Sequence, residues 1–273
     1  MLSNTPIQSL VDAGITYASM QTYVMVMVAL VIVMTVLDMM HKKSAQYFFE
    51  KAAKEKQNAT KTAPAASILV KTIVTDVALS GEFCNQTRRL VHLLTMYGFI
   101  SFNVATAMMI FGDNAADSTL NLFWHLGAIS LFVGSWWFWF VFKVDVAAEG
   151  NTWTNIEIRR DMFSLSLMAT STTALVWSLT GGGTGVWFIL VILSTASLFG
   201  GVYWSKFSHM FFKPAAAYNK RTVHADGSNE NLPEIPDLAS AELHARFPDI
   251  PEYMGKNPGY MGLGIKNEEP KHY

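Results

Sequence analysis

Five long runs of the sequence carry almost no charge, and they constrain the fold more than any other feature. The spans that we predict from them cover about residues 18–40, 90–111, 120–142, 162–179 and 186–207. At a rise of about 1.5 Å per residue, such runs are long enough to cross a hydrocarbon core of roughly 30 Å. Buried helices of a soluble protein are the alternative, but these runs lack a polar face. The sequence therefore predicts an all-α, five-span transmembrane helix bundle, with a membrane domain at 18–213.

The basic residues all lie on one side of this arrangement. The 20 Lys and Arg residues fall in 42–89, at Lys143, at Arg159 and Arg160, and from Lys206 onward. The segments 1–22, 112–119 and 181–185 contain none. By the positive-inside rule, the N-terminal segment 1–17 is outside and the C-terminus is cytoplasmic. The location that we expect is the inner, cytoplasmic membrane of the cell. Four or six spans would scatter the basic residues over both faces.

Composition excludes several other classes of protein. Charged residues make up 15% of the chain and the net charge is −1, so a basic, nucleic-acid-binding protein is excluded. A single cysteine excludes a disulfide framework and every multi-cysteine metal site.

Three notable segments outside the predicted spans, two of them polar, lie on the cytoplasmic side. Residues 42–66 are polar and lead into 67–79, whose apolar side chains predict either an in-plane interfacial helix or a helix packed against the bundle. The tail 214–273 holds seven of the nine prolines and widely spaced apolar residues. That pattern favours an extended arm laid over a soluble partner, and a disordered tail is the alternative.

Four histidines lie at the ends of the predicted spans. His41, His92 and His209 are at the cytoplasmic boundary, and His125 is at the outer boundary. Haem b needs two facing imidazoles, and His92 and His209 share one depth on antiparallel spans, so they are the candidate axial ligands of at most one haem. Asp38, His41 and His125 are candidates for binding quinone or carrying its protons. Boundary histidines and charges that reach water are the alternative.

Small residues on two of the spans bear on the haem. Span 3 carries Gly127 and Gly134, and span 5 carries Ala196, Ser197, Gly200 and Gly201. They let either a flat macrocycle or another helix approach closely.

The stretch from Asp76 to Thr106 resembles the membrane cytochrome b subunits of the nitrate reductase gamma-subunit superfamily, in particular its quinone-interacting oxidoreductase branch. The matching residues are Phe83, Cys84, Arg88, His92, Tyr97, Gly98 and Phe99. The resemblance implies haem ligation by His92 and His209. A further histidine of the family is missing, because Ser80 and Gly81 stand in its place, and the second ligand pair is also absent. These departures argue against a two-haem chain.

Within this superfamily the chain looks most like the membrane anchors associated with adenylylsulfate reductase of sulfur-oxidising bacteria. The resemblance implies a non-catalytic subunit that links a soluble cytoplasmic flavin and iron–sulfur enzyme, oxidising sulfite, to the quinone pool. The tail 214–273 and the basic loops would bind that enzyme. A redox-inactive structural anchor or assembly protein is the alternative. A transporter is disfavoured by the odd number of spans and the lack of an internal repeat.

Overall fold

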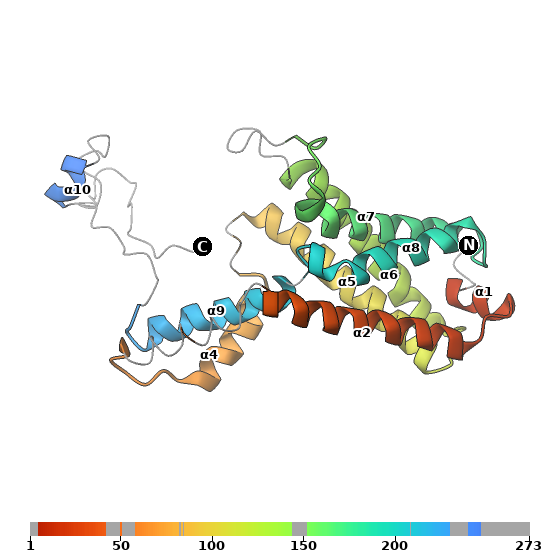
Figure 1. Cartoon of the computed structure of the whole chain (residues 1–273), viewed down its shortest axis with the longest axis horizontal. Coiled ribbons are helices and arrows are strands. Elements are labelled where there is room, and N and C mark those ends of the chain that lie inside the picture. The colour runs from red at the N-terminus through yellow and green to blue at the C-terminus, as the bar shows by residue number, and fades with distance from the viewer. Residues whose placement is uncertain are drawn as a thin grey trace.

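The computed structural model describes residues 5–41, 50, 58–81, 83, 85–143, 152–207, 209–229 and 240–246. Within these residues every regular element is a helix (Figure 1). The helices are α1 (Pro6–Asp12), α2 (Tyr17–His41), α4 (Ala65–Lys71), η1 (Thr72–Ala78), α5 (Gln86–Phe111), α6 (Ser118–Trp137), η2 (Phe138–Phe142), α7 (Ile158–Leu179), α8 (Val186–Gly200), η3 (Val202–Trp204), α9 (His209–Ala225) and α10 (Ala241–Arg246).

Four stretches of helix are long and apolar enough to cross a membrane, so the chain is a multi-pass membrane protein. They are Tyr17–His41, Gln86–Phe111, Ser118–Phe142 and Arg160–Leu179, and they confirm the first four predicted spans. The fifth predicted span, 186–207, contains α8, whose 15 residues rise only about 22 Å. Helix α8 is thus an apolar helix shorter than the other four.

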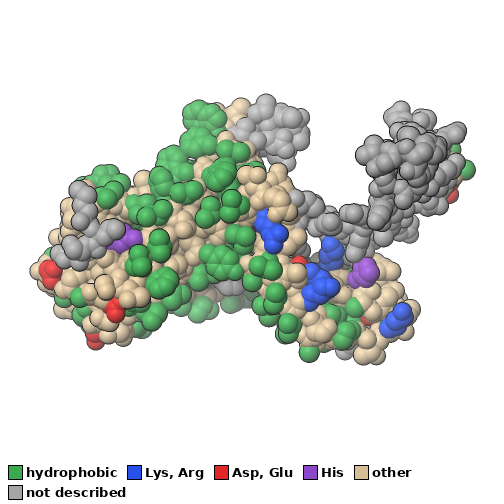
Figure 2. Space-filling model, turned by 180° about the vertical axis from the view of Figure 1, so that it is seen from behind, with side chains coloured by type: hydrophobic (Ala, Val, Ile, Leu, Met, Phe, Trp, Pro, Cys, Tyr) green, Lys and Arg blue, Asp and Glu red, His purple; other side chains and the backbone are tan. Residues whose placement is uncertain are grey.

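The bundle has two chemically different ends. One, here called the α1 end, holds α1 and the turns 112–117 and 180–185. The other, the α9 end, is where α2 finishes and where α4, η1 and α9 lie (Figure 1). Figure 2 shows hydrophobic side chains over the bundle, with Lys and Arg gathered towards the α9 end and acidic side chains at the α1 end.

Helices α5 and α6 pack with their backbones in direct contact. A Cβ atom added to Gly98 would lie 2.5 Å from the backbone nitrogen of Leu131, and one added to Gly127 would lie 2.5 Å from that of Phe102. At Gly134 the added Cβ would lie 2.8 Å from the backbone nitrogen of Thr95. These glycines thus serve close approach of a second helix, which is one of the two roles that the sequence left open for Gly127 and Gly134.

Hydrogen bonds between segments that are far apart in the sequence close the α1 end. Thr5 caps α1 and its hydroxyl donates to the carbonyl of Ala115. The hydroxyl of Ser9 accepts from the backbone N–H of Gly183 at 2.7 Å. Ile7 and Leu10, on the inner face of α1, are buried among side chains of the bundle. Helix α1 is therefore a cap on this end of the bundle.

At the α9 end, α4 and η1 form one continuous helix beside α9 (Figure 1). Arg221 of α9 donates to both carboxylate oxygens of Asp76 in η1, at 2.6 and 2.7 Å. The hydroxyl of Tyr97 in α5 donates to the carbonyl of Ala78 at 2.8 Å. The α4–η1 helix, predicted over 67–79, is thus joined both to α9 and to the bundle.

The first part of the predicted extended arm, which was expected to begin at residue 214, is helical and belongs to α9. Residues 214–225 continue α9, with Pro214 inside it. Proline disfavours a helix interior, but Ala215, Ala216 and Ala217 follow it and have the highest helix propensity. The ion pair of Arg221 with Asp76 then holds this segment against η1. An extended arm therefore starts no earlier than residue 226, and most of the remaining tail lies outside the described residues.

Candidate functional site

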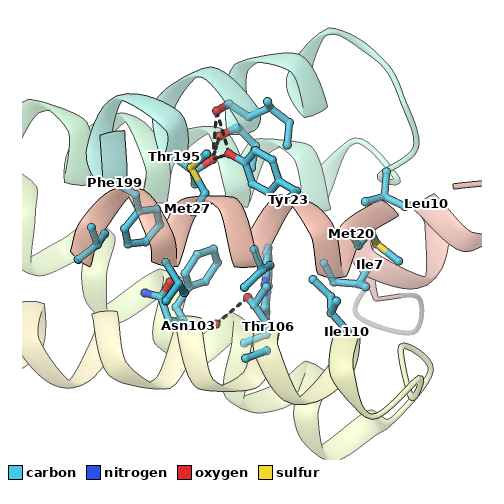
Figure 3. A pocket seen from close by; sticks show the side chains of 18 of the residues that line it. Ile7, Leu10, Met20, Tyr23, Met27, Asn103, Thr106, Ile110, Thr195 and Phe199 are labelled. Atoms are coloured by element: carbon cyan, nitrogen blue, oxygen red, sulfur yellow. Dashed lines mark hydrogen bonds between the residues drawn. The ribbon is translucent and has the colours of Figure 1, made fainter. Parts of the chain in front are cut away.

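The bundle interior holds an apolar cavity of about 630 Å³ between α2 on one side and α5 and α8 on the other. In Figure 3, α2 crosses the view with α8 on one side of it and α5 on the other. Met20, Tyr23 and Met27 of α2 line the cavity. At the α1 end the lining includes Ile7 and Leu10 of the α1 cap. At the α9 end it includes Phe207 and Met210. The cavity therefore extends through most of the depth of the bundle.

The polar groups Tyr23, Asn103 and Thr106 in the cavity wall are hydrogen-bonded to protein groups. The hydroxyl of Tyr23 lies 2.7 Å from that of Thr195 and 3.2 Å from the carbonyl of Ile192. Asn103 and Thr106 donate to carbonyls one turn earlier in α5, at 2.8 and 2.7 Å (Figure 3). Because the cavity contains no charged side chain and few polar ones, it suits a long hydrocarbon ligand.

Among the predicted haem ligands, His92 is placed on the first turns of α5. Its Nδ1 lies 3.0 Å from the hydroxyl of Ser80, and its ring centroid lies 4.9 Å from that of Phe83. A hydrogen bond to one ring nitrogen is the usual way to orient a metal-binding histidine. His209 begins α9, but its side chain lies outside the described structure, as does Cys84.

No histidine whose side chain the structure describes lines the cavity between α2, α5 and α8. Two of the small residues of the fifth predicted span, Ser197 and Gly201, are in contact with α7. A Cβ on Gly201 would meet the Met162 side chain at 2.4 Å, and Ser197 lies 3.3 Å from Ser166 across the α7–α8 contact. These two small residues therefore serve contacts between helices, and haem ligation by the pair His92 and His209 stays a prediction.

His125 is buried in α6 with both ring nitrogens engaged. Nδ1 lies 2.8 Å from the carbonyl of Asn121, and since a carbonyl only accepts, Nδ1 carries the proton. Nε2 lies 2.6 Å from the hydroxyl of Ser178 in α7. When the ring is neutral, Nε2 accepts a hydrogen bond from that hydroxyl. His125 thus ties α6 to α7 and does not face the cavity.

The other two proton candidates lie on the last turns of α2. Asp38 is 1% exposed, whereas a carboxylate reaching towards water would be accessible. His41 is exposed, and its ring centroid lies 5.9 Å from that of Tyr203. From Ile32 at the cavity wall, α2 rises about 9 Å to Asp38. Neither residue lines the cavity, but both lie just beyond it at the α9 end.

A second candidate site is the outer face of the α4–η1 helix. Its exposed apolar side chains are Leu69, Val70, Ile73 and Val74. Ile68 and Thr72 of the same helix are buried, so the helix turns its other side towards its neighbours. The sequence showed the apolar character of this segment but not which side stays open, because that depends on the contact with α9.

Comparison of the chain with known protein families, with curated proteins and with solved structures found no match. The structural features that bear on function are the cavity, the two ends of the bundle and the α4–η1 face.

Proposed function

We propose that the chain is a membrane anchor and electron-transfer subunit that binds a soluble flavin and iron–sulfur oxidoreductase at the α9 end and delivers its electrons to quinone. In this proposal the α9 end is cytoplasmic, and the membrane is the inner membrane. Following the family resemblance, the partner is adenylylsulfate reductase, which oxidises sulfite. The chain itself performs no substrate chemistry. Haem b on His92 and His209 would add a further step, but the proposal does not require it.

The observation that carries the proposal is the composition of the α9 end. It combines basic side chains with a helix, α4–η1, that presents apolar residues outside the bundle. The Arg221–Asp76 ion pair and the Tyr97–Ala78 hydrogen bond hold that helix in place. An apolar face that is held in place and surrounded by basic side chains suits the docking of a protein whose own apolar patch is surrounded by acidic side chains.

The topology supports the cytoplasmic placement if α8 crosses the membrane as the fifth span. The run from Val186 to Trp204 is free of charge and includes the turn η3 beyond α8. It packs beside α7 along the bundle (Figure 1). With this fifth crossing, every Lys and Arg falls on the side of α9, in keeping with the positive-inside rule.

The docking surface can be tested by placing a charge on the α4–η1 face. We expect Val70→Asp to reduce retention of adenylylsulfate reductase on the purified chain at least about tenfold, a loss of about 1.4 kcal/mol of binding free energy. The measurement is the amount of enzyme bound to chain in proteoliposomes. Ile158→Asp is the control, because Ile158 is exposed at the start of α7 and not on this face. Equal retention by Val70→Asp and the unaltered chain would rule out this surface.

The proton route can be tested separately at His41. We expect His41→Ala to slow sulfite-dependent quinone reduction by the assembled complex several-fold without releasing the enzyme, because an exposed imidazole at this boundary can relay protons. Tyr203→Phe is a matched control that keeps the ring packed against His41. Unchanged quinone turnover in His41→Ala would remove His41 from the route.

The redox-inactive anchor is the second candidate, and the same assay separates it. An anchor without redox function would retain the enzyme in proteoliposomes, but sulfite would then reduce no quinone there. The cavity between α2, α5 and α8 favours the quinone-linked function, since a mere anchor has no need of one.

A further inference from the structure

We propose that the cavity between α2, α5 and α8 binds the polyprenyl chain of a membrane quinone along its length, with the quinone head at the α9 end. The identity of the head rests on the function proposed above. The assignment of a long chain to the cavity rests on the depth, lining and openings of the cavity itself.

The depth of the cavity distinguishes a polyprenyl chain from the acyl chain of a phospholipid. The cavity is lined by Leu10 at the α1 end and by Phe207 and Met210 at the α9 end. It therefore extends through most of a hydrocarbon core of roughly 30 Å. An acyl chain belongs to one leaflet and covers about half of that depth. A polyprenyl chain is long enough to occupy both halves.

The lining suits such a chain. Aromatic rings lie along the wall, among them Phe102, Trp124 and Phe199, and they offer broad apolar surfaces to a methyl-branched chain. The polar groups nearby, Tyr23 and Thr195, are bonded to each other. A chain can therefore pass them without leaving a donor unsatisfied.

The cavity opens sideways and not towards the α1 end. Val28 and Ile32 line it, yet they are 53% and 58% exposed, so the opening beside α2 faces lipid. The α1 cap closes the cavity at the α1 end, since Thr5 bonds to Ala115 and Ser9 to Gly183. A polar head that follows its chain in from the lipid would therefore emerge at the α9 end, where Asp38 and His41 lie.

Filling the cavity tests the assignment. Val24 lines the cavity, whereas Val26, two residues along the same helix, does not and is exposed towards lipid. We expect the unaltered chain, purified with its native lipids, to contain long-chain quinone, and Val24→Trp to contain at least about tenfold less. Val26→Trp should keep the quinone. Ala107→Phe fills the cavity from the α5 wall and gives the same test if Val24→Trp does not fold.

Quantification of quinone and phospholipid in organic extracts of the three proteins decides the outcome. Phospholipid alone in the extract of the unaltered chain, or equal quinone in the filled and unfilled cavities, overturns the assignment. Loss of quinone only on filling the cavity supports it, even if no enzyme binds the α9 end and the proposed function fails. Conversely, if enzyme binds and reduces a short-chain decyl quinone while the extracts contain no long-chain quinone, the function stands and the assignment falls.

Discussion

Gly127→Ala adds a single methyl group, but it should lower the free energy of unfolding of the bundle by about 3 kcal/mol. The added Cβ would lie 2.5 Å from the backbone nitrogen of Phe102 and 2.9 Å from its Cα. Backbone atoms cannot turn aside as a side chain can, so α5 and α6 would have to separate along their contact. The loss would outweigh the gain of about 1 kcal/mol that alanine normally brings to a helix interior.

Thermal unfolding of the purified protein in detergent measures this effect, and we expect the midpoint to fall by roughly 10 °C. Gly200→Ala is the matched control, because Gly200 is also helical and an added Cβ would meet only the Leu30 side chain at 3.9 Å. That variant should unfold at or slightly above the temperature of the unaltered chain. Equal midpoints for the two variants would mean that α5 and α6 are not in backbone contact.

Four of the five spans could be predicted from the sequence because the low charge and the length of a span are local properties of the chain. The boundaries of α2 and α7 lie close to the predicted 18–40 and 162–179. Helix α9 could not be predicted in the same way. Pro214 signals a helix end, and what overrides it is the ion pair of Arg221 with Asp76, which lie 145 residues apart in sequence.

The candidate sites depend even more on contacts between distant residues. The sequence placed His125 at a span end, but its partner Ser178 lies 53 residues later, and the sequence does not show that contact. The cavity has no motif at all. Tyr23 and Thr195, which meet at its wall, are 172 residues apart, and either one alone is typical of an ordinary membrane helix. The apolar residues that enclose the cavity cannot be told from those that face lipid until the helices are assembled.

Asp161→Asn should be the most damaging of the single-charge substitutions at the α9 end. Lys143, which follows η2, places its ammonium group 3.0 Å from a carboxylate oxygen of Asp161 and 3.6 Å from the centre of the Trp139 ring. The two side chains are 7% and 6% exposed. A second cation, Arg160, donates to the same carboxylate. Neutralising Asp161 therefore leaves a buried ammonium without its counter-charge, at a cost of about 3–5 kcal/mol.

Glu157→Gln is the matched control, since it makes the same chemical change four residues earlier. Glu157 pairs with Arg160 at 3.6 Å, but its side chain is 66% exposed, so its loss should cost no more than about 1 kcal/mol. Unfolding midpoints in detergent compare the two variants directly. If they were equal, the Lys143–Asp161 pair would have to be open to water.

A double substitution shows whether the cost comes from the unpaired ammonium. Adding Lys143→Met to Asp161→Asn removes the buried charge that the first change leaves, and the midpoint should then recover by more than half. If the midpoint fell further instead, the loss in Asp161→Asn would come from the lost attraction between the two charges and not from an unpaired buried ammonium. This pair joins the end of η2 to the start of α7 at the α9 end, the same end as the α4–η1 face. The recovered double variant should therefore bind the soluble enzyme as well as the unaltered chain does, whereas Asp161→Asn should not.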